Sequence, residues 1–301
     1  MLFTSTVSSS PRQTWLLRRA LPAHPAIVVQ DHASRAPAPA HAHPYRWLRS
    51  RARYAGLRAA DGFLFTSAAQ ADAWRKSGVI AARQRTYAVV ESSTDLRPMP
   101  RLEARCSIGV RGAPAILWVG RLNANKDPIT VLEGFERALD ALPGSALTLV
   151  YQEDEMLRDV RARSSASVRL QDRVRLAGRV PHEKLSTYYS AADLFVLGSH
   201  HEGSGYALLE ACACGVVPVV TDIPAFRAIT GDGAVGALWP IGDPSGCAKA
   251  LEAVGRGTRE TLGRQVMAHF DRALRWDALG ARAVMAYADL MAQRQARLAG
   301  A

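Results

Sequence analysis

The 301-residue chain is long enough for about two domains, and its 48% hydrophobic and 22% charged residues are ordinary for a globular protein. Four cysteines without a paired CxxC spacing exclude a disulfide scaffold or a zinc ribbon and favour a reducing compartment. No run of about 18 apolar residues occurs, and the first residues lack the basic region of a signal peptide, so we expect a cytoplasmic protein.

The net charge of +11 is concentrated near the N-terminus. Residues 1–105 carry 16 basic and 6 acidic side chains, whereas the remaining 196 residues carry 22 and 21. Between residues 45 and 58, arginines alternate with tyrosine, tryptophan and leucine. This stretch is either a solvated helix face or a surface that attracts anionic lipid head groups. Because no RNA-binding aromatic motif or helix-turn-helix pattern accompanies it, we predict no nucleic-acid partner and keep peripheral membrane contact as a hypothesis.

The N-terminal region is the less regular part of the sequence. Pro11 favours a helix up to Ala20, the apolar runs 26–30 and 62–66 predict strands, and residues 33–44 predict a loop. Together with the charge step, the polar, glycine-containing stretch 105–112 predicts a boundary that ends a first domain at residue 108.

Strands and helices alternate in the second predicted domain, residues 109–257. Strands are predicted at 115–119, 146–151, 174–177, 194–197 and 216–220, with helices after Asp127-Pro128, around 183–192 and at 206–213. This alternation predicts a parallel sheet covered on both faces, an α/β domain of the Rossmann type. Residues 258–301 read as helices, interrupted only at Gly263 and Gly280, that pack back across the domains.

Two cations follow the first of these predicted strands. Arg121 comes just after the strand, and Lys126 precedes the helix that begins at Pro128. Ligands bind at the carboxyl ends of strands in an open parallel sheet, and a helix N-terminus favours an anion. The spacing therefore predicts a diphosphate site, although two ordinary surface cations would give the same pattern.

A second motif, Glu202-Gly203-Ser204-Gly205-Tyr206, runs into the predicted helix that contains Glu210. The glycines let the backbone approach a ligand, and carboxylates accept hydrogen bonds from sugar and ribose hydroxyls. The alternative is a plain helix start with a glutamate near its end.

These motifs, with Gly178-Arg179-Val180-Pro181, residues 192–199 and residues 214–220, resemble the retaining glycosyltransferases of family 4, which have the GT-B fold of two Rossmann-like domains. The resemblance extends from about residue 116 to 243 and keeps the order and spacing of the family motifs. It implies that the C-terminal domain binds a nucleotide-sugar and transfers the sugar to a glycan, lipid-linked or small-molecule acceptor.

The resemblance also implies residue roles. Arg121 and Lys126 would hold the diphosphate, Glu202 would bind the donor sugar beside the reacting centre, and Glu210 would bind the ribose. The turn of Gly203, Ser204, Gly205 and Tyr206 would line the sugar and phosphate, and the main chain at Val180 would meet the base. The family is usually metal-independent, so we expect no metal and no cofactor, with Arg121, Lys126 and Glu202 as the catalytic set.

The first domain resembles the family less. Asp31 and His32 follow a predicted strand and are the candidates to face the acceptor, while a structural role for this pair is the alternative. The earlier strand–helix units of the family are absent, so this domain is expected to be incomplete, through truncation or a misplaced start. The alternatives are therefore a non-catalytic nucleotide-sugar-binding remnant, or an epimerase or phosphorylase on the same fold.

Two further patterns are interpreted as unrelated to cofactors. The run Gly231 to Gly236 matches GxGxxG, but an apolar strand-like stretch follows it instead of the helix that a dinucleotide site needs. His200 and His201 are adjacent on extended chain, so their side chains point in opposite directions and do not predict a metal site.

Overall fold

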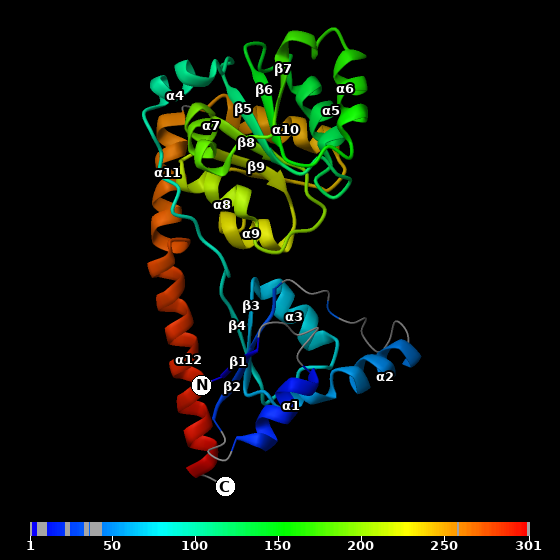
Figure 1. Ribbon diagram of the computed structural model, residues 1–301, viewed down its shortest axis with the longest axis vertical. Helices are drawn as coiled ribbons and strands as arrows, with labels where there is room; N and C mark the ends of the chain where they lie inside the picture. The colour runs from blue at the N-terminus through cyan, green and yellow to red at the C-terminus, as the bar shows by residue number, and fades with distance from the viewer. Residues whose placement is uncertain are drawn as a thin grey trace. The chain divides into compact units, whose positions relative to one another are not determined.

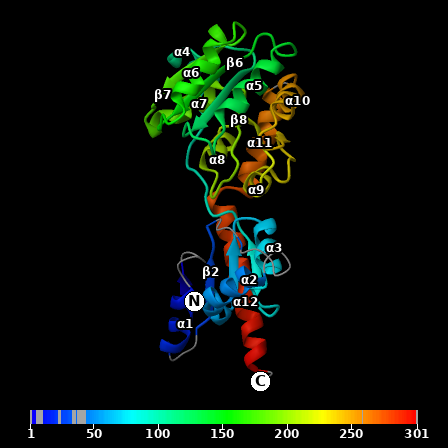
Figure 2. The same ribbon diagram turned by 90° about the vertical axis from the view of Figure 1, so that its right-hand side faces the viewer.

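A computed structural model describes residues 2–4, 11–21, 25–32, 36, 44–257 and 259–299 of the chain. The chain forms two compact units. Unit 1 comprises Met1–Glu91 and Trp276–Ala301, and unit 2 comprises Ser92–Arg275. Figures 1 and 2 show the elements of each unit.

Unit 2 is built on a six-stranded parallel sheet. Its strands are β5 (Ala115–Gly120), β6 (Ala146–Tyr151), β7 (Val174–Gly178), β8 (Leu194–Leu197), β9 (Val217–Thr221) and β10 (Ala237–Trp239). In the order β10-β9-β8-β5-β6-β7, the chain runs from β5 through β6 to β7 at one edge of the sheet. It then crosses back to β8, on the other side of β5, and continues to β10 at the opposite edge. The predicted parallel α/β sheet is therefore present, with strand bounds close to those expected from the apolar runs.

Helices cover both faces of this sheet (Figure 1). They are α4 (Arg101–Ile108), α5 (Pro128–Ala138), α6 (Leu157–Ser165), α7 (Leu185–Ala191), α8 (Tyr206–Ala213), α9 (Pro224–Thr230), α10 (Pro244–Gly255) and α11 (Arg259–Ala273). Asp127 caps α5 by accepting from the N–H of Thr130, and a proline occupies its first turn. The close packing of α5 on α10 requires Gly134, where a Cβ would lie 2.6 Å from the Cβ of Cys247.

Asp193, at the start of β8, ties α4 to unit 2. Its Oδ2 accepts from Arg105 Nη2 at 2.6 Å and from the N–H of Ala115 at 2.7 Å, and its Oδ1 is paired with Arg101. The contacts of α4 thus lie within unit 2, and the division between the units falls at residues 91/92, whereas the sequence placed the boundary at 108/109. Most of the basic residues that produce the charge step lie before residue 92, and the two arginines of α4, Arg101 and Arg105, are both paired with Asp193.

Unit 1 contains a smaller parallel sheet in the order β1-β2-β3-β4. Its strands are β1 (Leu2–Thr4), β2 (Ile27–Gln30), β3 (Gly62–Phe65) and β4 (Arg85–Ala88), and its helices are α1 (Pro11–Ala20), α2 (Pro44–Arg53), the short 3-10 helix η1 (Ala55–Ala59), α3 (Ala68–Lys76) and α12 (Trp276–Ala299). The loop predicted at 33–44 lies almost entirely outside the described residues.

The predicted interruptions of the C-terminal helices at Gly263 and Gly280 are wrong. The break lies at Leu274 and Arg275, whose N–H groups both donate to the carbonyl of Phe270 as α11 ends. A glycine inside a helix costs only about 1 kcal/mol, which packing overcomes. After the break, α12 contributes Leu290 to an apolar cluster of unit 1.

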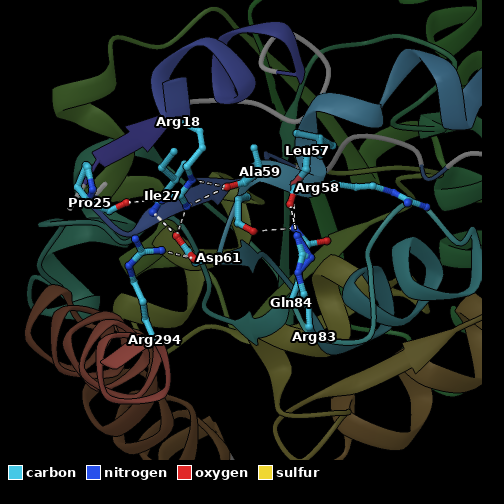
Figure 3. A network of polar contacts seen from close by, with 11 residues as sticks. Arg18, Pro25, Ile27, Leu57, Arg58, Ala59, Asp61, Arg83, Gln84 and Arg294 are labelled. Carbon is cyan, nitrogen blue, oxygen red and sulfur yellow. Dashed lines mark hydrogen bonds and ion pairs between the residues drawn. The ribbon is translucent and has the colours of Figure 1, made fainter. Parts of the chain in front are cut away.

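Asp61, whose side chain is 12% exposed, joins α1 and α12 to the sheet of unit 1 (Figure 3). Asp61 Oδ2 accepts from the N–H of Ile27 at 2.8 Å and pairs with Arg18 of α1. Its Oδ1 pairs with Nη1 of Arg294 on α12 at 2.7 Å. Arg18 also donates to the carbonyls of Pro25 and Ala59, so α1, α12 and the start of β2 share one network.

Candidate functional site

A cavity of about 400 Å³ opens in unit 2 at the carboxyl ends of β5 and β6. It is bounded on the other side by the start of α8, which follows β8. Because the chain leaves β5 on one side and returns on the other, this is the switch point where open parallel sheets bind ligands. The lining residues are Val119, Gly120, Arg121, Lys126, Val150, Tyr151, Gln152, Val180, Leu185, Glu202, Ser204, Gly205, Tyr206, Ala207 and Glu210.

The two loops that carry Lys126 and Glu202 are hydrogen-bonded to each other. The Asn125 side chain donates to the carbonyl of His201 at 3.0 Å and accepts from its N–H at 3.1 Å. The main chain of Asn125 also accepts from the N–H of His200 at 2.8 Å. These bonds align the loop after β5 with the loop after β8, which places residues 126 and 202 beside one another.

Lys126 and Glu202 form an ion pair in the cavity wall. Their side chains are only 17% and 11% exposed, and Ser199 Oγ donates to the same carboxylate oxygen of Glu202 at 2.7 Å. Solvent screens such a partly buried pair less than a surface pair. The pair sets a cation and a carboxylate side by side, where they can meet neighbouring phosphate and hydroxyl groups of one ligand.

Arg121 is the second cation of the cavity, and other side chains of the protein neutralise it much less than they neutralise Lys126. Its side chain is 65% exposed, and its Nε lies 3.5 Å from Glu153 Oε1, itself 54% exposed. An exposed pair of this length contributes little free energy, so the guanidinium can turn toward an anion at small cost. Arg121 therefore supplies a positive charge available to a ligand in the cavity.

The start of α8 supplies backbone donors to the cavity. Gly205 precedes the helix with a left-handed φ of 64°, and a Cβ there would lie 2.7 Å from Ile229 Cδ1. The first N–H groups of a helix have no partner within it, and the helix dipole makes this end attractive to anions. Ser204, Gly205, Tyr206 and Ala207 of this turn all line the cavity.

Glu210 lies one turn further along α8, where it is almost buried. Its residue is 7% exposed. Oε2 accepts from the hydroxyl of Tyr189 at 2.9 Å, and Oε1 lies 2.9 Å from Nε2 of His182. An ionised carboxylate can only accept hydrogen bonds, so Nε2 of His182 carries the proton in this contact. Burial and the adjacent Glu210 charge raise the pKa of Tyr189 well above its ordinary value, so its hydroxyl remains a donor.

The structure brings the predicted donor-side residues together around this one cavity, with a single exception. Gly203 belongs to the same turn but is not among the lining residues. Sequence reasoning missed Tyr189 and His182, which hold Glu210, and Asn125, which joins the loops. A buried tyrosine hydroxyl needs a hydrogen-bond partner, so the sequence could suggest that Tyr189 has one. It could not show that this partner is Glu210.

The predicted acceptor-side pair lies in unit 1, at the carboxyl end of β2. Asp31 is fully buried and accepts from the side-chain amide of Gln70, so its surroundings are those of a structural carboxylate. His32 has a 43% exposed side chain and is paired with the nearly buried Glu91. These contacts secure the end of β2 within unit 1.

The two remaining sequence patterns have structural roles. Gly231 ends α9 with a left-handed φ of 64°, and the strand β10 follows the glycine run, so the helix of a dinucleotide site does not follow it. His200 Nε2 lies 3.0 Å from Asp127 Oδ2, at the start of α5. Among the described residues, no group of three or more His, Cys, Asp or Glu side chains is placed to hold a metal ion.

The two parallel sheets with their covering helices give the α/β architecture of GT-B glycosyltransferase structures. The family model described as glycosyl transferases group 1 matches residues 107–263. This match spans more than half of the chain and contains all of the cavity residues. The chain belongs to the glycosyl transferases group 1 family.

Curated relatives match part of the chain. A D-inositol 3-phosphate glycosyltransferase of Streptosporangium roseum is 31% identical over 193 residues, which covers 60% of this chain and 43% of the relative. The GDP-mannose:cellobiosyl-diphosphopolyprenol alpha-mannosyltransferase of Xanthomonas campestris is 30% identical over 138 residues, covering 46% of this chain and 35% of the relative. The matches thus span less than half the length of these relatives.

Solved structures match the chain over nearly its whole length. Sucrose-phosphate synthase from Thermosynechococcus elongatus superimposes with a TM-score of 0.69 at 25% identity, covering 96% of this chain and 73% of that protein. Anabaena HepE in complex with UDP superimposes with a TM-score of 0.76 at 16% identity, covering 95% and 78%. The latter likeness is one of fold.

No helix in the described part of the chain is long and apolar enough to cross a bilayer.

Proposed function

We propose that the chain is a family 4 glycosyltransferase that moves a sugar from a nucleoside-diphosphate donor to an acceptor with retention of configuration. The observation that carries this proposal is the convergence of Arg121, Lys126, Glu202 and Glu210 on one cavity at the sheet's switch point. Support also comes from the family and from the fold shared with a UDP-bound protein.

In this proposal the diphosphate lies between the two cations and the start of α8. Cleavage of the bond between the sugar and the diphosphate leaves negative charge on the leaving phosphate. Arg121, Lys126 and the N–H groups of the turn before α8 stabilise that charge, which is the main catalytic contribution. They do what a divalent ion does in other phosphate sites, so we propose a metal-independent reaction without a cofactor.

The two glutamates bind hydroxyl groups on either side of the diphosphate. Glu202, held by Lys126 and Ser199, accepts from hydroxyls of the donor sugar close to the reacting carbon. Glu210 accepts from the ribose, and the main chain at Val180 meets the base. The acceptor is a glycan, a lipid-linked sugar or a small molecule, as the names of the relatives suggest.

The direct test is nucleotide binding followed by transfer. Thermal shift is measured with UDP, GDP, ADP and their sugars, and the preferred base should give the largest shift. A ligand at a hundred times its Kd stabilises a protein by about 2.7 kcal/mol, which such a measurement detects. Transfer is then measured as nucleotide release that depends on acceptor and continues in EDTA. Conversion of one nucleotide-sugar into another without net nucleotide release would support an epimerase, and binding without turnover a non-catalytic remnant. A complete lack of nucleotide binding would exclude the proposal.

We also propose that unit 1 brings the protein to an anionic membrane surface on the cytoplasmic side. The described residues 11–21 and 44–60 contain arginines but no aspartate or glutamate. Helix α2 buries none of its residues, and Tyr45 and Leu48 are 72% and 61% exposed among its arginines. Exposed aromatic and aliphatic side chains beside cations match the interface of an anionic bilayer.

Vesicle sedimentation tests this contact. We expect salt-sensitive binding to vesicles that contain phosphatidylglycerol and none to phosphatidylcholine alone. The triple variant Arg46→Gln, Arg49→Gln, Arg51→Gln should lose that binding and keep nucleotide binding, since none of these residues lines the cavity. Binding to RNA in preference to vesicles, or equal vesicle binding by the triple variant, would contradict the proposal.

A further inference from the structure

Both oxygens of the Glu210 carboxylate are held by side chains of the protein itself. Tyr189 donates to Oε2 and His182 contacts Oε1, each at 2.9 Å. Each carboxylate oxygen can accept about two hydrogen bonds, so one acceptor position remains on each oxygen. Glu210 lines the cavity, and these positions are the ones it can offer to a ligand.

Of the two side chains that contact Glu210, Tyr189 is the more rigidly placed. It is fully buried on α7, where its ring lies 6.1 Å from that of Phe195. Its raised pKa, caused first by burial and then by Glu210, keeps the hydroxyl protonated. His182 has a side chain that is 67% exposed, so water competes for its contact with Glu210. The orientation of the carboxylate is therefore set mainly from the buried side.

We propose that Tyr189 is a positioning residue that orients Glu210 to accept both hydroxyls of a ribose, and so makes the donor site selective for ribonucleotides over deoxyribonucleotides. This inference rests on the proposed function. Two neighbouring hydroxyls can donate to the two oxygens of one oriented carboxylate. A deoxyribose lacks one donor and leaves a nearly buried acceptor unpaired, which a site built for hydroxyl groups penalises strongly.

The test compares affinities for a ribonucleotide and its deoxy analogue by titration calorimetry. The ligands are UDP and 2′-deoxy-UDP, or the matching pair for whichever base binds. We expect the unmodified chain to prefer the ribonucleotide by about 10- to 100-fold, the scale of one hydrogen bond to a charged group. Tyr189→Phe keeps the buried ring, and we expect it to reduce this preference at least about 5-fold, mainly through weaker ribonucleotide binding.

Neighbouring residues supply matched controls. Tyr188 lies on the same helix, and within the described structure its hydroxyl makes no hydrogen bond, so Tyr188→Phe should keep the full preference. His182→Gln retains a donor on the exposed side and should change the preference less than Tyr189→Phe does. If Tyr189→Phe does not fold, Glu210→Asp tests the same step, because its shorter side chain draws the carboxylate away from Tyr189.

The outcomes separate this inference from the proposed function. An unchanged ribo-to-deoxy ratio in folded Tyr189→Phe, or equal losses for both ligands, would overturn the positioning role. A retained ratio in Glu210→Asp would do the same. Nucleotide binding without any preference in the unmodified chain overturns this inference alone, whereas no nucleotide binding at all overturns the proposed function and this inference with it.

Discussion

Lys126 and Glu202 are 76 residues apart in the sequence, yet they form an ion pair in the wall of one cavity. The pairing of Asn125 with His201 brings their loops together. In the free protein the Lys126 ammonium and the Glu202 carboxylate neutralise each other. A ligand that separates them must therefore offer an anion to Lys126 and hydroxyl donors to Glu202. The two residues should therefore respond differently to substitution.

Substitutions in this pair should separate nucleotide binding from transfer. Lys126→Ala removes a cation and leaves the Glu202 charge near the diphosphate, so we expect nucleoside-diphosphate affinity to fall by about 10- to 100-fold. Glu202→Gln releases Lys126, so nucleotide affinity should be kept or improved while transfer slows by about 100-fold or more. Calorimetry and single-turnover transfer measure the two effects. Equal losses of nucleotide affinity in both variants would argue against the separate roles.

Arg121 should act mainly on the rate. Arg121→Ala is expected to lower kcat/KM for transfer by about 30- to 1000-fold, equivalent to about 2–4 kcal/mol of transition-state stabilisation. Arg179, an exposed arginine of unit 2 that donates to the carbonyl of Gln152 and does not line the cavity, provides the control variant Arg179→Ala. Near-normal kcat/KM in Arg121→Ala would remove the residue from the proposed mechanism.

The turn before α8 should depend on Gly205. Gly205→Ala forces a side chain into a left-handed backbone and toward Ile229 Cδ1. Gly242→Ala is the control, because Gly242 has a similar φ of 68° but no atom within 4 Å of the added Cβ. Backbone strain of about 1–2 kcal/mol is common to both. We expect only Gly205→Ala to lose nucleotide affinity, and urea denaturation should show the larger destabilisation for it.

The Asp193 cluster should be important for the stability of unit 2. Asp193→Ala leaves Arg101 and Arg105 without their carboxylate and the N–H of Ala115 without its acceptor. Because the arginines are 39% and 23% exposed and the N–H of Ala115 is buried, we expect a loss of about 1–3 kcal/mol, the cost of a buried polar group left without its partner. Chemical denaturation monitored by tryptophan fluorescence measures the loss. A change below about 1 kcal/mol would show that α4 is held mainly by its apolar contacts.

Stability should fall in alkaline solution because of buried thiols. Burial, with a smaller contribution from Cys214, raises the pKa of Cys212 from 9.0 to about 12. The unfolded chain then loses this proton at lower pH than the folded chain does, so the free energy of unfolding decreases as pH rises above about 9. Between the two pKa values, one such group contributes about 1.4 kcal/mol per pH unit.

The variant Cys212→Ala should reduce this alkaline slope by that amount. Cys106→Ala is the control, since Cys106 is exposed on α4. Urea denaturation at pH 8, 9, 10 and 11 gives the slope for each variant. The interpretation fails if Cys212→Ala and the unmodified chain lose stability in parallel.

The sequence predicted the architecture of unit 2 well because its strands are buried apolar runs with clear ends. Ile116 to Val119 and Leu194 to Leu197 lie in the sheet as expected, and Asp127-Pro128 begins α5. The charged residues of the cavity were also predicted, since motif residues at strand ends in a parallel sheet share one edge, whereas Tyr151, Gln152 and Leu185 of its lining were not.

What the sequence did not reveal depends on contacts between distant residues. Tyr189 and His182 show no local pattern that identifies Glu210 as their partner. The strand β4, Arg85–Ala88, has the sequence RTYA without a buried apolar run, so its pattern of exposed and half-buried residues hid it. The boundary between the units depended on the pairing of Arg105 with Asp193, 88 residues away.

The Asp61–Arg294 pair and the packing of Leu290 beside Val28 and Leu64 make unit 1 discontinuous in the chain. During synthesis on the ribosome, the segment that contains β2 and β3 emerges long before α12. Unit 2, which is continuous, can then fold while the first segment still lacks its closing helix. Loss of the last 26 residues, Trp276–Ala301, would therefore leave unit 2 folded and expose the apolar residues of unit 1 that pack against Leu290. Chaperones and proteases would recognise that form.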